Sequence, residues 1–264
     1  MPDFNKVKVE TEDGVAVVML NHPEVMNAIS VDMLEGLIAA LDFIEDRSNG
    51  VRCVVLTGAG KGFCAGANLQ GRNTSTSKSG GAGSVLESHY HPILRRMRRL
   101  HCPLLTAING AAAGAGMSLS LMGDLKLACK SAYFLQAFRR IGLVPDADST
   151  WMLPRLVGTA RAMELSLLGE KLPAEKALEW GLINRVYDDA ELMNEAKKMA
   201  KELANGPTKA LALIRGLYWD SPENTFEEQL DLEYRTQRIA GASADFKEGV
   251  TAFLEKRPAK FRGE

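Results

Sequence analysis

Two segments rich in glycine and alanine stand out in the first half of the chain, and each follows a short apolar run. Residues 62–69 follow the run at 52–57, and residues 107–118 continue the run at 103–108. Apolar runs of this length predict buried strands, and small residues let a ligand approach the backbone, so that N–H groups can point at an anion. Two such donors converging on one oxygen would form an oxyanion hole. The pattern indicates an enzyme that stabilises an enolate.

Strand-like and helix-like segments alternate up to about Asp148, and the rest of the chain is helical in pattern. The expected strands are 7–10, 15–20, 52–57, 103–108, 124–129 and 132–135, and the helices among them are 30–47, 85–100 and 114–122. Further helices are expected at 149–157, 159–168, 174–180, 189–205, 207–219, 223–240 and 243–256. This order predicts an α/β core over 1–200 and a C-terminal helical oligomerisation region over 201–264.

Local signals refine this outline. Ser30 is the expected N-cap of the helix at 30–47, with Asp32 in its first turn. Residues 70–84 have almost no apolar side chain to bury and are expected to form a mobile loop, either a lid or plain surface. Residues 85–100 carry a basic helix face, which is expected to be solvated, with contact to a ligand phosphate as the less favoured alternative.

The composition is that of a globular protein, with 46% hydrophobic residues, 25% charged residues and a net charge of −1. This charge gives no argument for a nucleic-acid or membrane partner, and no apolar stretch could span a bilayer. The first residues lack the apolar region of a secretory signal, so we expect a cytoplasmic protein with buried free thiols. The cysteines and histidines match no metal-ligand spacing. They are Cys53, Cys64, Cys102, Cys129, His22, His89, His91 and His101.

The segment Thr-Gly-Ala-Gly-Lys-Gly at 57–62 invites comparison with nucleotide-binding turns. It resembles the dinucleotide turn of short-chain dehydrogenases, but no tyrosine is followed four residues later by the lysine that those enzymes use. It is not a phosphate-binding P-loop either, because Lys61 is followed by Gly62 rather than by Ser or Thr. A nucleotide-binding domain is therefore disfavoured.

Five longer strings carry a family resemblance: GKGFCAGANL, AINGAAAGAGMSLSLMGD, FLQAFRRIGLVPDADSTWMLPRLVG, KLPAEKALEWGLINRV and DFKEGVTAFLEKRPAKF. Together they cover nearly the whole chain and resemble the enoyl-CoA hydratase/isomerase (crotonase) superfamily. The resemblance implies a spiral core of ββα units and a C-terminal helical trimerisation region, in a homotrimer or a dimer of trimers. It also implies an acyl-CoA thioester substrate from fatty acid or aromatic catabolism. Coenzyme A is then part of the substrate, and no separate cofactor or metal is expected.

The resemblance also places the oxyanion hole. It assigns the two backbone donors to Ala67 and Ala115, with Gly114 or Gly116 as the alternative if the register is shifted by one. The N-terminus of the helix at 114–122 adds partial positive charge near the same oxygen. The substrate-binding residues implied in this way are Ala28, Ala65, Gly66, Asn68, Leu69, Gly114, Gly116, Ser118 and Phe138.

The chain departs from the hydratases of the superfamily at both of their catalytic glutamates. Ser118 and Phe138 stand at those positions, and a carboxylate appears instead at Asp146. Acids at this position resemble those of the isomerases, of the enoyl-CoA or 1,2-epoxyphenylacetyl-CoA type. Asp146 is therefore expected to move a proton, with its pKa raised by burial against Phe138, Leu143 and Trp151.

Other readings of these residues stay open. Asp146 could instead cap the helix that begins near Ser149, and Asp148 is both another candidate cap and a reserve acid. Asp124 is expected to be structural. The rival functions are an enoyl-CoA hydratase that uses Asp146 or Asp148 with water, and a non-catalytic acyl-CoA-binding protein. The CoA phosphates could meet basic residues near the C-terminus, which could also be a solvated tail; the candidates are Lys256, Lys260 and Arg262.

Overall fold

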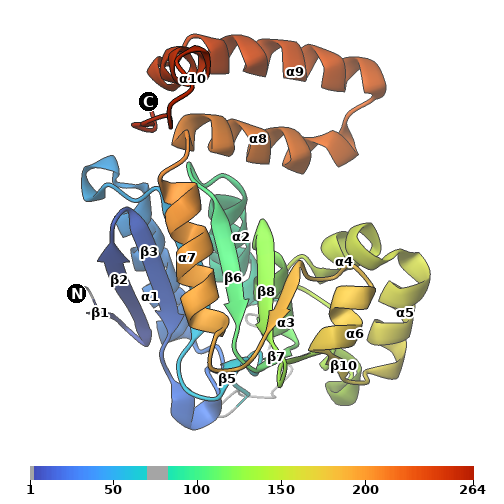
Figure 1. Cartoon of the computed structure of the whole chain (residues 1–264). Helices are drawn as coiled ribbons and strands as arrows, with labels where there is room; N and C mark the ends of the chain where they lie inside the picture. Colours follow the sequence, from blue (N-terminus) through green and yellow to red (C-terminus); the bar gives the residue numbers. More distant parts are fainter. Residues whose placement is uncertain (1–2, 70–82) are drawn as a thin grey trace.

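The computed structural model describes residues 3–69 and 83–264, which form two sheets and the helices that surround them (Figure 1). The expected loop at 70–84 lies mostly outside the described residues. The larger sheet has the order β1-β2-β3-β4-β6-β8-β11, and the smaller has the order β10-β9-β7-β5. The larger sheet comprises β1 (Asp3–Phe4), β2 (Val7–Glu12), β3 (Val15–Leu20), β4 (Cys53–Gly58), β6 (Leu104–Ile108), β8 (Leu125–Cys129) and β11 (Arg185–Tyr187). The smaller comprises β5 (Gly62–Cys64), β7 (Ala111–Ala113), β9 (Tyr133–Leu135) and β10 (Leu172–Pro173).

Three successive units build the core, each with a strand in the larger sheet, a strand in the smaller sheet and a helix. β4 and β5 precede α2 (His91–Arg98), β6 and β7 precede α3 (Ala115–Leu121), and β8 and β9 precede α4 (Ser149–Val157). The equivalent strands of the units are parallel to one another in both sheets. The predicted α/β fold, a spiral of ββα units, is confirmed.

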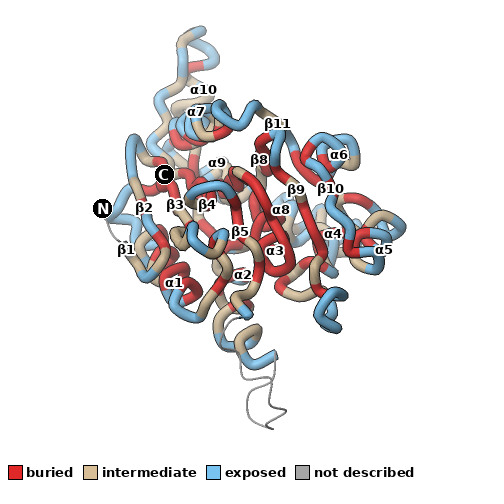
Figure 2. The backbone as a smooth tube through the Cα atoms, turned by 90° about the horizontal axis from the view of Figure 1, so that it is seen from below, coloured by how far each residue is buried: buried red, intermediate tan, exposed pale blue. Residues whose placement is uncertain are grey.

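Helices cover both faces of the larger sheet, so β4 and β6 are buried at every residue. α7 (Leu192–Ala204) lies on one face, and α1 (Val31–Glu45) and α2 lie on the other (Figure 1). Buried residues are concentrated in the strands and in α3 (Figure 2). The predicted cap of α1 is confirmed, because the Ser30 hydroxyl accepts a hydrogen bond from the N–H of Met33 at 3.3 Å.

Five short strands, β1, β5, β7, β10 and β11, are absent from the sequence prediction. Each has only two or three residues, which is too few to show an alternating pattern. β5 and β7 also lie within the glycine- and alanine-rich segments, where local sequence favours a turn. They become strands because the neighbouring unit of the spiral supplies a partner for their backbone groups.

The later helices follow the predicted bounds closely. α4 and α5 (Thr159–Leu168) have the predicted limits, and α6 (Ala174–Glu179) ends one residue early. The proposed boundary between residues 200 and 201 falls inside α7, whose buried alanines pack on the larger sheet. The last three helices, α8 (Thr208–Asp220), α9 (Phe226–Gly241) and α10 (Ala244–Leu254), stand apart from both sheets (Figure 1). None of the helices in 3–69 and 83–264 has the length and apolarity needed to cross a membrane.

A close backbone approach joins α3 to β5. A Cβ atom added to Gly116 would lie 2.3 Å from the carbonyl oxygen of Cys64 and 2.7 Å from its Cβ and Sγ atoms. Both segments are buried, so neither has room to move away. Glycine at position 116 therefore brings the start of α3 against the end of β5.

We expect Gly116→Ala to destabilise the fold by about 1–3 kcal/mol, the usual result of overpacking a core. Urea unfolding followed by circular dichroism measures this loss. Gly216→Ala is the matched control, because Gly216 lies in α8 with no atom within 4 Å of the added Cβ. That control should gain roughly 0.5–1 kcal/mol from helix propensity, and equal behaviour of the two variants would contradict the close approach.

Candidate active site

A cavity of about 230 Å³ lies where the end of β5 meets the start of α3. Its other walls are the turn of π-helix at Leu86–Tyr90 and the segment that leads from β9 to α4. The predicted site residues that line it are Ala65, Gly66, Ala67, Leu69, Gly114, Ala115, Phe138 and Asp146. The structure therefore brings both predicted backbone donors and the predicted acid to one cavity.

The N–H of Ala67 faces this cavity because its neighbours face the other way. The carbonyl of Gly66 accepts from the N–H of Ile29 at 2.7 Å, and the N–H of Asn68 donates to the carbonyl of Ile29 at 2.8 Å. Backbone groups alternate in direction along an extended segment, so the groups of Ala67 point away from Ile29. Gly66 permits this path with a φ of +93°, where a Cβ would lie only 2.7 Å from the carbonyl oxygen of Ala113.

The second donor lies at the start of α3. Ala115 is the first residue of this helix, and the first N–H groups of a helix have no partner within it. Gly114 precedes it with a φ of +51°, and its own N–H donates to the carbonyl of Leu135 at 2.8 Å. The free end of α3 adds partial positive charge. Two backbone donors thus face one cavity from two different units of the spiral.

Asp146 reaches the cavity from the turn before α4, and its Oδ1 atom is buried. Two hydroxyls hold its backbone carbonyl, Ser118 Oγ at 2.9 Å and Ser149 Oγ at 2.7 Å, and these hydroxyls lie 3.1 Å from each other. Asp148, not Asp146, occupies the N-cap of α4, and its side chain makes no capping hydrogen bond. The capping interpretation is therefore wrong for Asp146, whereas Asp148 holds the cap position as predicted but does not cap through its side chain.

Four of the predicted substrate-binding residues do not line this cavity. Gly116 faces Cys64, and Ser118 is fully buried behind Asp146. Ala28 donates its N–H to the carbonyl of Val25 in a local turn, and Asn68 donates its N–H to the carbonyl of Ile29 in the strand-like contact behind Ala67. These four residues lie outside the lining of the cavity, and their predicted role in substrate binding stays a prediction.

The expected contact of Trp151 with Asp146 is also wrong. Trp151 stacks on Trp219 of α8 with ring centroids 5.7 Å apart, and the guanidinium of Arg155 lies 4.0 Å above its ring. These side chains line a second cavity of about 350 Å³ between α4 and α8. Trp151 therefore lies on the α8 side of α4, whereas Phe138 and Leu143 lie in the wall beside Asp146 as expected.

Part of the cavity wall was not predicted from sequence. Tyr90 is almost fully buried at the end of the π-helical turn, and Val85, Leu86 and Ile141 add apolar surface. Arg140 completes the wall and donates to the carbonyl of Gly169 at 2.7 Å. A π-turn often marks a functional site, but the sequence signal was only that of an ordinary helix at 85–100.

Other predicted roles are settled by the surrounding contacts. Asp124 is structural as predicted, since it accepts from the N–H of Leu104 at 2.7 Å and pairs with buried Arg215 at 2.5 Å. The four cysteines are free and buried as predicted, and burial raises the pKa of Cys64 to about 12. Among residues 3–69 and 83–264, no cluster of three or more His, Cys, Asp or Glu side chains could hold a metal ion.

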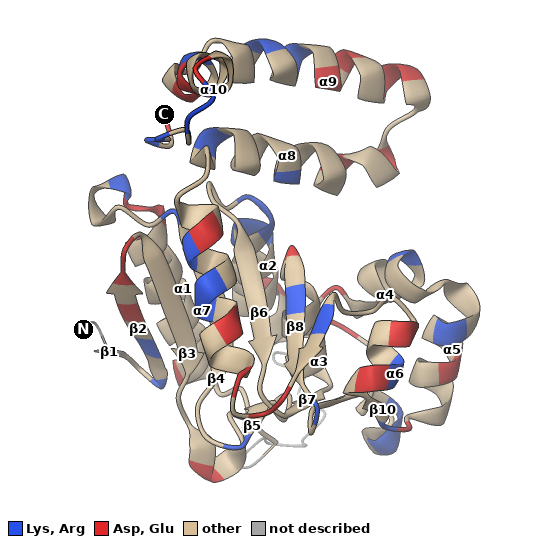
Figure 3. Ribbon diagram, viewed as in Figure 1, with Lys and Arg blue, Asp and Glu red and all other residues tan. Residues whose placement is uncertain are grey.

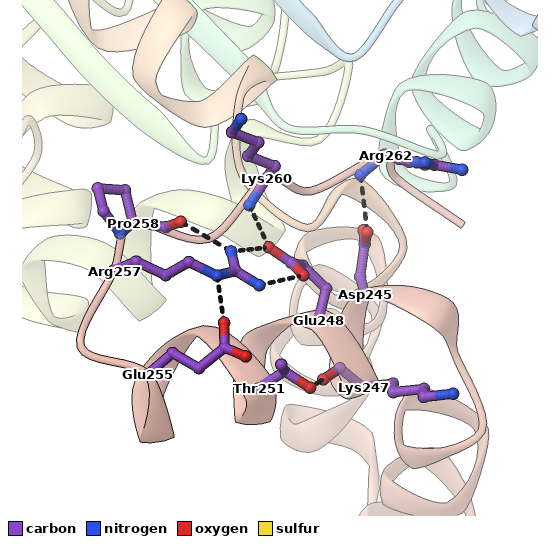
Figure 4. A network of polar contacts seen from close by, with 9 residues as sticks. All are labelled: Asp245, Lys247, Glu248, Thr251, Glu255, Arg257, Pro258, Lys260 and Arg262. Carbon is purple, nitrogen blue, oxygen red and sulfur yellow. Dashed lines mark hydrogen bonds and ion pairs between the residues drawn. The ribbon is translucent and has the colours of Figure 1, made fainter.

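The C-terminal tail is pinned against α10 (Figure 4). Arg257 makes two contacts with the Glu248 carboxylate at 2.7 and 3.0 Å, and the N–H of Lys260 donates to the same group. These hydrogen bonds lower the pKa of Glu248 to about 2. The N–H of Arg262 donates to Asp245 at 2.7 Å. The tail is thus ordered through its backbone, and a role of its basic side chains in binding CoA phosphate stays a prediction.

A family model described as enoyl-CoA hydratase/isomerase matches residues 10–264. The chain belongs to this family. It is 46% identical to the 1,2-epoxyphenylacetyl-CoA isomerase of Escherichia coli strain K12, over 96% of this chain and 97% of the relative. It is 44% identical to a protein of Rhodobacter capsulatus named "Probable enoyl-CoA hydratase", over 98% and 99%. A solved enoyl-CoA hydratase/isomerase from Cupriavidus metallidurans CH34 superposes with a TM-score of 0.92 at 30% identity, covering all of this chain and 98% of that one.

The backbone path at Gly66 provides a test of the paired donors in this member of the hydratase/isomerase family. Gly66→Ala should force a shift against Ala113 and displace the N–H of Ala67. Loss of one such donor typically lowers kcat by about 10²–10³. The rate at which phenylacetyl-CoA exchanges its α-hydrogens in deuterated water measures this loss. Gly241→Ala is the control, because no atom lies within 4 Å of a Cβ added at Gly241. An unchanged exchange rate in Gly66→Ala would remove Ala67 from the site.

Proposed function

We propose that this enzyme is an acyl-CoA isomerase acting on an unsaturated or epoxidised acyl-CoA, of the enoyl-CoA or 1,2-epoxyphenylacetyl-CoA type. The observation that carries the proposal is the position of Asp146 as the carboxylate in the described wall of the cavity that Ala67 and Ala115 face. The similarity to the Escherichia coli isomerase supports it.

The proposed reaction moves one hydrogen between carbons. The thioester oxygen accepts hydrogen bonds from the N–H groups of Ala67 and Ala115, and these donors stabilise the negative charge of the enolate. The Asp146 carboxylate takes a proton from the α- or γ-carbon and returns it to another carbon of the conjugated system. No electrons are gained or lost overall, so coenzyme A enters only as part of the substrate.

The predicted test compares the acid with the residue that supports it. Asp146→Asn keeps the shape of the side chain but cannot accept the proton, and should lower the isomerisation rate by about 10²–10⁴. Ser118→Ala removes one of two hydroxyls on the Asp146 carbonyl, so its loss should be smaller. Enoyl-, dienoyl- and arylacetyl-CoA thioesters in deuterated water provide the assay. Equal and negligible losses in both variants would reject Asp146 as the base.

A hydratase is the second candidate, because a relative named as a hydratase is almost as similar as the isomerase. Hydration would use Asp146 or Asp148 with water. It would consume the conjugated enone absorbance of crotonyl-CoA, whereas isomerisation of a non-conjugated enoyl-CoA would create that absorbance. Tight binding of thioesters without deuterium entering the acyl chain would instead indicate a non-catalytic acyl-CoA-binding protein.

We also place the enzyme in a homotrimer or a dimer of trimers, in the cytoplasm. The buried free thiols favour a reducing compartment. α9 has no buried residue, and its exposed apolar side chains continue onto α10. Apolar patches of this kind mark protein interfaces; they include Phe226, Leu230, Tyr234, Ile239, Phe246, Phe253 and Leu254.

The oligomer can be tested at the most exposed of these side chains. Phe253 is 83% exposed in the single chain, so Phe253→Asp should place a charge in the interface and reduce the mass measured by sedimentation. Lys198→Asp changes an exposed side chain of α7 and serves as the control. A wild-type mass equal to one chain would contradict the oligomer.

A further inference from the structure

The turn that carries Asp146 into α4 has an unusual backbone. Ala147 and Asp148 follow it with φ values of +49° and +81°. Two consecutive non-glycine residues in this left-handed region cost conformational energy, and such strain persists where the surrounding structure enforces it, often at functional sites. Ala147 is buried, and the N–H groups of Trp151 and Met152 both donate to the carbonyl of Asp148.

Burial of the Asp148 side chain adds a second cost in conformational stability. Both of its carboxyl oxygens are buried, and neither has a hydrogen-bond partner among the residues that the structure describes. Burial raises the pKa of Asp148 to about 8, and the charge of Lys126 acts in the opposite direction. A buried polar group without a partner requires an explanation, and nothing in the proposed reaction uses this one.

Lys126 is a buried cation whose charge acts on both Asp148 and Asp124. It lies on β8 and is only 6% exposed, so burial lowers its pKa while the charges of Asp124 and Asp148 act to raise it. Asp124 is held in turn by Arg215 of α8 at 2.5 Å. Basic and acidic side chains therefore alternate from α8 to the turn that carries Asp146, in the order Arg215, Asp124, Lys126 and Asp148. The elements α8 and β8, with their charged residues coloured, appear in Figure 3.

The other elements around Asp148 add little charge. α3 has no ionisable side chain, and its nearest polar group is the Ser118 hydroxyl on the Asp146 carbonyl. On α4, the guanidinium of Arg155 lies over the ring of Trp151, in the second cavity. Asp146 itself is the remaining titratable group of the turn. Lys126 is thus the charge that acts on Asp148.

We propose that Asp148, at the end of this row of charged side chains, is a positioning residue that holds the strained turn and places the Asp146 carboxylate over the substrate. This role rests on the proposed function of Asp146. The Ser118 and Ser149 hydroxyls fix the Asp146 carbonyl from one side. Once Asp148 is ionised, its attraction to Lys126 fixes Ala147 and Asp148 from the other side. Neither Asp148 nor Lys126 lines the substrate cavity, so both act through Asp146.

The role has a pH signature. When Asp148 ionises, its attraction to Lys126 strengthens, so kcat should rise as the pH passes through about 8. Stability has the opposite trend. The pKa of Asp148 is higher in the folded than in the unfolded state, so the folded chain binds the extra proton between about pH 4 and pH 8 and loses stability across that window as the pH rises.

Asp148→Gly separates positioning from mere folding. Glycine accepts the positive φ without strain and removes the buried carboxyl, so the midpoint of thermal unfolding should rise at about pH 8. The kcat for isomerisation should nevertheless fall about 10- to 100-fold, the scale of a misplaced catalytic group. KM should stay nearly constant, and the rise of kcat near pH 8 should disappear. Asp148→Asn and Lys126→Met should lose the same pH step.

Asp13→Gly is the matched control. Asp13 is another aspartate with positive φ, at +50°, but it lies in the exposed turn between β2 and β3. The substitution Asp13→Gly should leave kcat and the pH profile of kcat unchanged. If Asp148→Gly and Asp148→Asn keep the wild-type kcat and pH profile while Asp146→Asn is inactive, the positioning role is overturned and the proposed function stands. If Asp146→Asn stays active, the proposed function itself fails.

Discussion

The close contact of two backbone segments, the end of β5 and the start of α3, is the constraint on which the site depends. Cys64 packs against Gly116, and the carbonyl of Ala113 packs against Gly66, so closely that a Cβ atom at either glycine would clash. Because the two segments belong to successive units of the spiral, their contact brings together N–H groups that are almost fifty residues apart. A carbonyl oxygen between them would meet donors that are already fixed in place, and such preorganisation is what makes an oxyanion hole effective.

The same spiral explains why the acid comes from a third segment. β9 pairs with β7, and the segment that follows β9 leads to α4. Ser118 then meets the carbonyl of Asp146. At the position where the family resemblance predicts a hydratase carboxylate, this chain has a hydroxyl that holds the turn of another carboxylate. Ser118 thus replaces one proposed catalytic carboxylate, and its hydrogen bond to the Asp146 carbonyl helps to place the other.

Much of this architecture was predictable because it depends on local signals. The Ser30 cap, the helices α4 and α5 and the apolar strands of the larger sheet need only periodicity and capping chemistry. The short strands β5 and β7 depend on partners from other units, and local sequence does not show them. The cavity wall at Tyr90 and Ile141 likewise depends on how distant segments pack, and the direction of Trp151 was decided by its stacking on Trp219.

A reaction that relies on one acid places a stricter demand on position than a reaction shared between two. With two carboxylates, each transfer can use the group that lies nearer; with one, the same oxygen must reach the carbon that loses the proton and the carbon that gains it. A turn held by two serine hydroxyls and, once Asp148 is ionised, by its attraction to buried Lys126 meets that demand. The strain at Ala147 and Asp148 then follows from the geometry that Asp146 needs, since a relaxed turn would point the carboxylate elsewhere.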